Sequence, residues 1–191
     1  MQLSPRNKYD PDKYDREGRF LTRTGREIDI LDFKTSDVEL DEIAHALAMT
    51  CRYGGHCREF YSVAQHAVMV ARYLEGQGEP LPVVMAGLHH DDSEAYLGDI
   101  IRPLKSLLPM YKEIETRFEM TLAEHFGLQY PYPLAVHKAD VRVFEQEVED
   151  VKWHTPENPV IVPWSWQRAK TEYLREHNML KIRMELEVCE E

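Results

Sequence analysis

The stretch AGLHHDDSEAYLGDI, from Ala86 to Ile100, places two histidines, two aspartates and a glutamate side by side in a segment that otherwise has the pattern of a buried helix. Pro82 precedes it, and proline is favoured in the first turn of a helix. We therefore expect a helix from Val83 to Gly98. The question is which of its ionisable side chains share one face.

At about 100° per residue, a small apolar sector runs along this helix with Asp91 at its centre. His90 and Glu94 lie on the edge of that sector, within roughly a quarter-turn of Asp91. His89 and Asp92 point to the opposite side. The pattern predicts that His90, Asp91 and Glu94 act together.

An aspartate and a histidine buried together need compensation, which a divalent metal provides for both. A metal needs further ligands, so we expect them on neighbouring helices. His66 and Asp140 each lie on or beside an apolar helical stripe. Each alone is more often a hydrogen-bonded core residue, a cap or part of an ion pair. Together, in the order His66, His90-Asp91, Asp140, they favour a metal site.

The rest of the chain predicts an all-α bundle with a short N-terminal β-hairpin. GRFLTRTGREIDI indicates a hairpin that turns near Thr24-Gly25. Apolar residues recur with helical spacing in five further segments. These cover about residues 37–54, 62–76, 109–126, 134–153 and 165–187, the second with a capping-box pattern at Ser62 and Gln65.

Length and composition favour one domain over residues 1–191, of which 43% are hydrophobic. We divide it into an N-terminal tail and hairpin (1–36), a core with the metal site (37–153), and a loop with a C-terminal helix (154–191). The net charge of −11 argues against a nucleic-acid polymer as partner.

We expect neither a signal peptide nor a membrane span, because no apolar run has the required length. Cys51, Cys57 and Cys189 form no metal-type pair and leave an odd thiol, which favours reduced thiols and a cytoplasmic location.

The order H…HD…D resembles the ligand pattern of the HD-domain superfamily of metal-dependent phosphohydrolases. The resemblance is greatest to the subgroup that contains bacterial 5′-deoxynucleotidases and phage deoxynucleoside triphosphate hydrolases, and it covers about residues 37–150. The segments that carry it are CRYGGH (51–56), SVAQHAVMVA (62–71), HDDSEAYLGDI (90–100), YKEIE (111–115) and VHKAD (136–140).

The resemblance implies an HD-domain helical bundle with His66, His90, Asp91 and Asp140 as metal ligands. Such a mixed nitrogen and oxygen site suits one divalent transition metal, Mn²⁺, Fe²⁺, Co²⁺ or Zn²⁺. The extra histidine and aspartate of HHDD depart from the family pattern. If the helix were rotated by one position, His89 would compete for the metal.

The resemblance also implies roles for four other residues. Glu94 would work on the attacking water, and Asp99 would support that water or the phosphate. Arg52 would hold phosphate oxygens, as arginine does through two parallel hydrogen bonds. Lys105 would do the same, although a solvated lysine is an equally good interpretation.

The implied function is hydrolysis of a deoxynucleoside phosphate by attack of water on the α-phosphate. Two forms stay open: a dNMP 5′-nucleotidase, or a dNTP triphosphohydrolase with dATP as one candidate substrate. The alternatives are a signalling-nucleotide hydrolase and a non-catalytic nucleotide-binding protein. The resemblance further implies a homo-oligomer, a dimer or larger, with Trp164, Trp166 and the last helix as the candidate surface.

Overall fold

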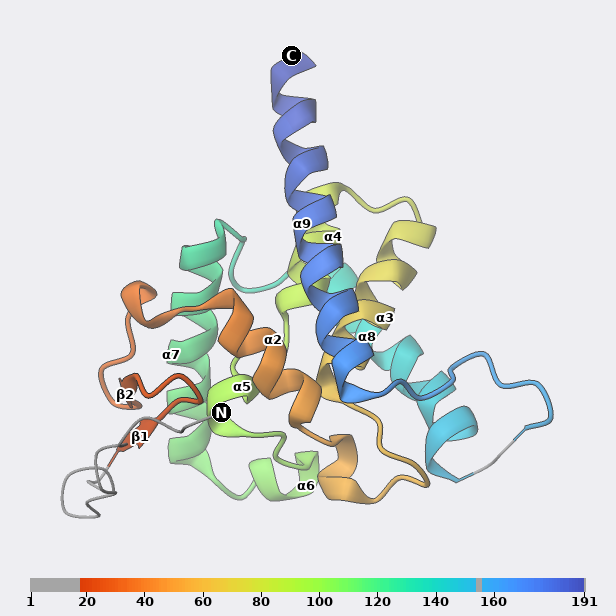
Figure 1. The fold of residues 1–191 in the computed structure, drawn as a ribbon, viewed down its shortest axis with the longest axis horizontal. Coiled ribbons are helices and arrows are strands. Elements are labelled where there is room, and N and C mark those ends of the chain that lie inside the picture. Colours follow the sequence, from red (N-terminus) through yellow and green to blue (C-terminus); the bar gives the residue numbers. More distant parts are fainter. Residues whose placement is uncertain (1–17, 154–155, 191) are drawn as a thin grey trace, which may run out of the picture.

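The computed structural model describes residues 18–153 and 156–190, with side chains to residue 187, and the predicted tail before residue 18 lies outside this range. The described chain is mostly helical, with one small antiparallel sheet near the N-terminus (Figure 1). Strands β1 (Arg19–Leu21) and β2 (Glu27–Asp29) form the hairpin, and Phe20 pairs with Ile28. Both the helical class and the hairpin are confirmed.

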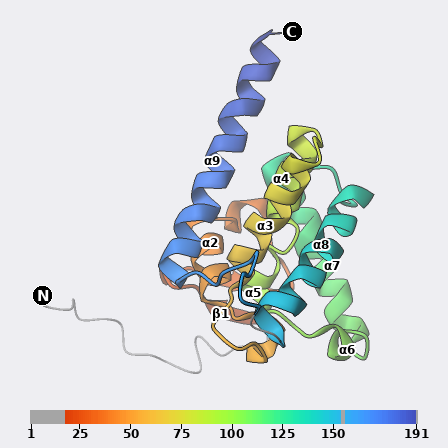
Figure 2. The same cartoon turned by 90° about the vertical axis from the view of Figure 1, so that its right-hand side faces the viewer.

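The longer helices other than α4 correspond to the predicted segments. The longer helices are α2 (Leu40–Met49), α3 (Val63–Gly76), α4 (Leu81–His89), α7 (Pro109–Phe126), α8 (Leu134–Glu147) and α9 (Trp166–Glu190). Shorter elements are η1 (Thr35–Asp37), η2 (Arg52–Gly55), α5 (Glu94–Leu97), α6 (Arg102–Lys105) and the π-helical turn η3 (Val148–Lys152), which continues α8. Helices α3 and α4 pack against each other, and both contact α8 and α9 (Figures 1 and 2).

The prediction of one helix from Val83 to Gly98 is wrong. Helix α4 ends at His89, a turn follows, and α5 begins at Glu94. In the turn, the amide of Glu94 donates to the carbonyl of Asp91 at 3.0 Å, three residues back. The His90 side chain also bonds to the carbonyl of Gly87 at 2.8 Å. Such local side-chain and backbone bonds compete with the regular helical ladder and break it here.

The start of α3 is capped as predicted, because the amide of Gln65 donates to Ser62 Oγ at 3.1 Å. The Gln65 side chain, however, bonds to the backbone of Val162 and Trp164 at 2.9 and 2.8 Å. These bonds tie the loop before α9 to α3. Trp164 is consequently buried, so its assignment to an oligomer surface is wrong, whereas Trp166 is half-buried.

Helix α9 extends beyond the body of the molecule toward the C-terminus (Figure 2). In its second half Met179, Ile182 and Leu186 are 50%, 51% and 59% exposed. Their spacing of three and four residues places them on one side of the helix. The last helix therefore carries an apolar stripe that the described part of the chain does not cover.

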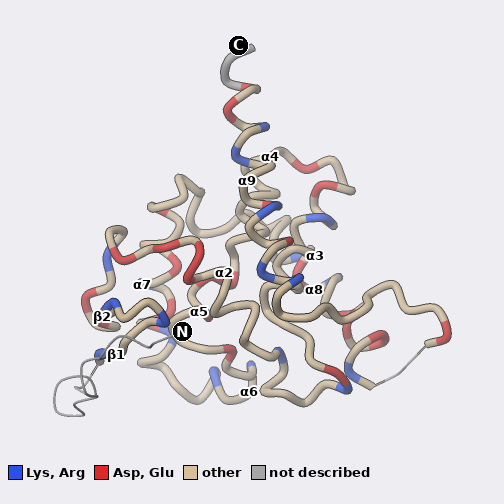
Figure 3. The backbone as a smooth tube through the Cα atoms, in the orientation of Figure 1, with Lys and Arg blue, Asp and Glu red and all other residues tan. Residues whose placement is uncertain are grey.

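Charged residues are spread along the chain, and two basic residues lie on the short helix α6 (Figure 3). Within residues 18–153 and 156–190, no helix is long and apolar enough to cross a membrane.

The contact between α3 and α4 depends on Gly87. A β-carbon at this position would lie 2.2 Å from Leu74 Cδ1, well inside van der Waals contact. Leu74 is almost fully buried, so it has little room to move away. Because Gly87 lies just before the turn with His90 and Asp91, this close approach also sets how near those residues come to α3.

We predict that Gly87→Ala lowers the free energy of unfolding by about 1–3 kcal/mol, since overpacking outweighs the gain in helix propensity. Urea denaturation measures this change in the free energy of unfolding. Gly76→Ala is the matched control, because no atom lies within 4 Å of its β-carbon position, and it should be neutral or stabilising. In a double-mutant cycle with Leu74→Ala, the two losses should be less than additive. A Gly87→Ala protein as stable as the parent would contradict this account.

Candidate metal centre and adjoining cavity

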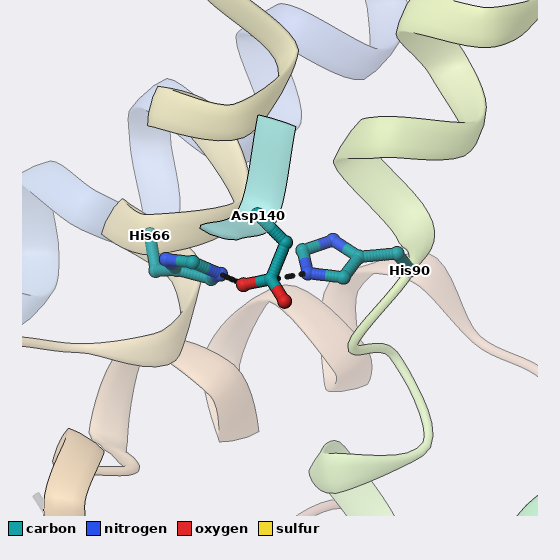
Figure 4. A group of neighbouring side chains, drawn as sticks. All are labelled: His66, His90 and Asp140. Atoms are coloured by element: carbon teal, nitrogen blue, oxygen red, sulfur yellow. Dashed lines mark ion pairs between the residues drawn. The ribbon is translucent and has the colours of Figure 1, made fainter. Parts of the chain in front are cut away.

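Three predicted ligands from different parts of the chain meet at one point (Figure 4). His66 comes from α3, His90 from the turn after α4, and Asp140 from α8. One donor atom from each lies within 4.8 Å of the others. Asp140 Oδ1 is 3.2 Å from His66 Nε2 and 4.0 Å from His90 Nε2.

The fourth predicted ligand, Asp91, borders this group. Its Oδ2 atom is 3.6 Å from His66 Nε2 and 3.4 Å from His90 Nε2. It also lies 3.4 Å from Arg52 Nη1, so its charge is shared between the cluster and the guanidinium. Two donors that each bind one metal at about 2.0–2.2 Å lie roughly 3–4 Å apart. The separations of 3.2–4.0 Å given above lie in this range and suit a single ion.

The chemistry of the donors supports the same fit. The Nε2 atoms of His66 and His90 are buried and make no hydrogen bond within the described chain. Buried polar atoms are normally hydrogen-bonded, so two such atoms facing one point call for a partner. His90 Nδ1 donates to the Gly87 carbonyl, which leaves its Nε2 with the lone pair that a metal binds.

Electrostatics favour a positive charge at this point. Burial and the charge of Arg52 lower the pKa of His66, but Glu147 and Asp140 outweigh them and raise it to about 9. Burial raises the pKa of Asp140, whereas His66, His90 and Arg52 bring it below its ordinary value. The carboxylates on both sides of His66 therefore favour positive charge at this point, and binding of a cation here would compete with binding of protons.

Next to the cluster lies a cavity of about 450 Å³ that reaches several predicted functional residues. It is lined by Arg52, Asp91, Glu94, Asp99, Lys105 and Asp140, and also by Tyr53, His56, Arg102 and Lys152, which sequence analysis did not include. Glu94 is 7% exposed, and its Oε2 atom is buried without a partner in the described chain. Burial, and then the charges of Asp91 and Asp99, raise the pKa of Glu94 well above its ordinary value.

Arg52 reaches the cavity from a turn with unusual backbone geometry. Tyr53, Gly54 and Gly55 have φ values of 61°, 60° and 81°, in the left-handed region that glycine adopts readily. Tyrosine in that region is unfavourable by about 1–3 kcal/mol and persists only where its surroundings hold it. Asp99 supplies one such hold, because its carboxylate accepts a 3.1 Å hydrogen bond from the Tyr53 amide.

Lys105 lines the cavity, but its charge is already paired. Its Nζ atom lies 2.5 Å from Glu115 Oε1. Lys112 is exposed and does not line the cavity. Two cavity cations were missed, Arg102 and Lys152. Nothing local marks them, because surface lysines and arginines are ordinary in this sequence.

A buried carboxylate missed by sequence analysis, Glu147, supports the cluster from behind. It is fully buried, and its Oε1 atom lies 2.7 Å from His66 Nδ1. The signal was available in the sequence. Glu147 follows Asp140 by seven residues and Val143 by four, so it continues the stripe on which the predicted ligand lies.

His89 and Asp92 point away from the metal cluster, but they point into the protein interior and not into solvent. Both are fully buried, so the expectation that only His90, Asp91 and Glu94 share an inward face is wrong. His89 Nδ1 is 2.6 Å from Asp92 Oδ2, and His89 Nε2 is 2.9 Å from His177 Nδ1. Both ring nitrogens of His89 are therefore occupied, and neither is left for a metal.

Two of the three cysteines are neighbours. Cys51 and Cys57 are free thiols with their Sγ atoms 3.5 Å apart, and neither belongs to the metal cluster. The side chain of Cys189 lies outside the described residues.

Comparison with known proteins finds relatives without a described activity. No protein-family model matches the chain. It is 37% identical over 115 residues to the uncharacterized protein YfdR of Escherichia coli K12, covering 60% of this chain and 62% of YfdR. It is 36% identical over 123 residues to an uncharacterized protein of Rhodobacter capsulatus, covering 61% of this chain and 62% of that protein. The chain therefore spans less than two thirds of the length of either relative.

We predict that His90→Ala abolishes stoichiometric metal binding, whereas His89→Ala retains it. The reason is that His90 Nε2 is unpaired and His89 has no free nitrogen. His89→Ala should instead lower the free energy of unfolding by about 1–3 kcal/mol, because it leaves buried partners unpaired. Metal binding is measured as the metal content after reconstitution and gel filtration. The free energy of unfolding is measured by urea denaturation. Metal loss in His89→Ala alone would overturn the assignment.

The His89–His177 pair predicts a pH dependence of stability. Burial, and then electrostatic interaction with His89, Lys181 and His125, lower the pKa of His177 to about 4. The unfolded histidine titrates near 6.5, so this stabilisation is complete above about pH 6.5 and is lost as the pH falls toward 4. The slope attributable to this residue is at most about 1.4 kcal/mol per pH unit.

The measurement is urea denaturation between pH 4 and 8 for the parent and for His177→Asn, whose side-chain amide can replace Nδ1 in the hydrogen bond with His89 and does not titrate. The parent should lose stability more steeply below about pH 6.5, and the two curves should run parallel above it. Equal slopes throughout would contradict the prediction.

Proposed function

We propose that the protein is a metal-dependent phosphohydrolase of the HD-domain superfamily that acts on deoxynucleoside phosphates. The observation that carries the proposal is the pair of buried, unpartnered Nε2 atoms of His66 and His90, beside two aspartates at one end of the cavity. The H…HD…D resemblance supports the same class. Neither relative has a described activity, so the proposal stands on the site.

His66, His90, Asp91 and Asp140 would hold the ion. When bound, such a metal polarises a phosphoryl group and lowers the pKa of a coordinated water. Glu94 is suited to accept a proton from water, because its carboxylate faces the cavity with one oxygen unpaired. Its raised pKa brings its basicity closer to that of a group that works at neutral pH.

Four cations line the cavity and would face the phosphate, although Lys105 is already paired with Glu115. Arg52 is deepest, and Arg102, Lys105 and Lys152 complete the group. The same cavity is lined by four carboxylates, those of Asp91, Glu94, Asp99 and Asp140, so a bound divalent metal would supply the net positive charge that suits an anionic ligand. Lys112 is a further basic residue that would favour a longer phosphate tail if it lined the cavity, but it is exposed and does not line it. The 5′-nucleotidase and the triphosphohydrolase therefore both remain proposals.

We also propose, for the protein as a whole, a cytoplasmic location and a homo-oligomer. The oligomer is supported by the exposed stripe of Met179, Ile182 and Leu186 on the projecting part of α9. A second copy of the chain would cover apolar surface that this copy leaves in water.

The test is an assay of purified protein loaded with Mn²⁺, Co²⁺ or Zn²⁺ against dNMPs, dNTPs, NMPs, NTPs, cyclic nucleotides and guanosine tetraphosphate. Nucleoside and orthophosphate from monophosphates would establish a 5′-nucleotidase. Nucleoside and tripolyphosphate from triphosphates would establish a triphosphohydrolase. Turnover of signalling nucleotides alone, or binding of nucleotide without product, would overturn the proposal in favour of the corresponding alternative. His90→Ala serves as the metal-free control.

We predict that Glu94→Gln lowers turnover by about 10²–10⁴-fold while metal content stays unchanged. The amide keeps the shape of the side chain but cannot accept the proton from water. Glu113→Gln is the matched control, because Glu113 is an exposed acid that does not line the cavity. Near-full activity in Glu94→Gln would show that another group activates the water.

A further inference from the structure

Glu147 contacts side chains from both halves of the candidate site. Through Oε1 it lies 2.7 Å from His66 Nδ1 and accepts a 2.9 Å hydrogen bond from the Tyr61 hydroxyl. Through Oε2 it accepts a bond from the Tyr53 hydroxyl and lies 3.3 Å from Arg52 Nε. Each oxygen therefore has two neighbouring groups in a place without water access, of which Arg52 Nε makes an ion-pair contact and no hydrogen bond.

The charge state of Glu147 follows from these partners. The hydroxyls of Tyr53 and Tyr61 both donate to it, and the Arg52 guanidinium lies beside it, so its neighbours are those that suit an ionised, accepting carboxylate. An ionised carboxylate only accepts hydrogen bonds. His66 Nδ1 must then carry the proton of their shared bond.

A neutral imidazole with its proton on Nδ1 has its lone pair on Nε2. In this structure His66 Nε2 is the atom that faces Asp140 and Asp91. The same carboxylate accepts on its other oxygen from the Tyr53 hydroxyl and pairs with Arg52 Nε, which leaves Nη1 beside Asp91.

We propose that Glu147 is a positioning residue that holds His66 with Nε2 directed at the metal and holds Arg52 toward the phosphate, so that one buried charge aligns both halves of the site. This inference rests on the proposed function. Its two consequences are separable, because the first concerns metal affinity and the second concerns substrate binding.

The first experiment compares Glu147→Gln with the parent. The amide is nearly isosteric but removes the charge and replaces an acceptor with a donor. We expect the affinity for Zn²⁺ or Co²⁺, measured by chelator competition on the purified protein, to fall by about 10–100-fold, the usual effect of losing a group that orients a metal ligand. We also expect KM to rise when the metal is saturating.

Asp150→Asn is the matched control. Asp150 is another buried acid just after α8, and it accepts from the amides of Val160 and Ile161 and from Gln146 without reaching the cluster. It should lose stability but retain the parent's metal affinity and KM. If Glu147→Gln matched Asp150→Asn in both metal affinity and KM, the positioning role would be wrong and Glu147 would be structural.

A second measurement needs no substitution in this carboxylate, and so decides the question even if Glu147→Gln fails to fold. The Zn²⁺-loaded parent, labelled with ¹⁵N in histidine, is recorded by long-range ¹H–¹⁵N NMR, with His66 identified by the loss of its signals in His66→Asn. We expect His66 to show a protonated Nδ1 and a metal-bound Nε2. Metal on Nδ1, or an unprotonated Nδ1, would overturn the inference.

The possible failures are distinguishable. A parent protein that binds no divalent metal would overturn both the proposed function and this inference. A parent that binds metal but turns over none of the nucleotides would overturn the function alone. The affinity and NMR readings would then still decide the role of Glu147.

Discussion

Four side chains between residues 52 and 66 meet the buried carboxylate of Glu147, and their positive or proton-donating groups allow it to stay charged away from water. A carboxylate in this place without partners would be strongly unfavourable. The buried partners of Glu147 need its charge as much as Glu147 needs theirs. Arg52 and His66 are themselves buried, and Glu147 compensates them. The geometry of the candidate site follows from satisfying these charges together.

The segment around the cluster shows how adjacent residues serve different purposes. His90 and Asp91 face the cluster and the cavity, whereas His89 and Asp92 enter a second buried network with His177. Helix α4 is packed by α3, α8 and α9, and its residues from 84 to 89 are all buried, so its C-terminal end has no solvent side on which to place the extra histidine and aspartate. Tyr173 of α9 completes the network by donating to Asp92. The last helix is thereby tied to the turn that carries two predicted ligands.

The backbone beside the cavity also helps to hold Arg52 in one orientation. The left-handed turn at Tyr53 is held by Asp99 on one side and by the Tyr53 hydroxyl on Glu147 on the other. Strain of this kind is found where a neighbouring group must be presented in one orientation. Here the neighbour is Arg52, whose guanidinium is nearly enclosed by protein.

The sequence by itself determined what depends on local spacing. The 3.6-residue period predicts the helices, the Thr24-Gly25 turn predicts the hairpin, and the stripes carrying His66 and Asp140 single out residues that the fold does bring together. Only the tertiary structure decided what depends on distant partners. Glu147 and His66 are 81 residues apart, so no local pattern pairs them. The break after His89 and the pairing of Lys105 with Glu115 likewise result from competing hydrogen bonds and charges, whose balance is set by which groups folding places within reach.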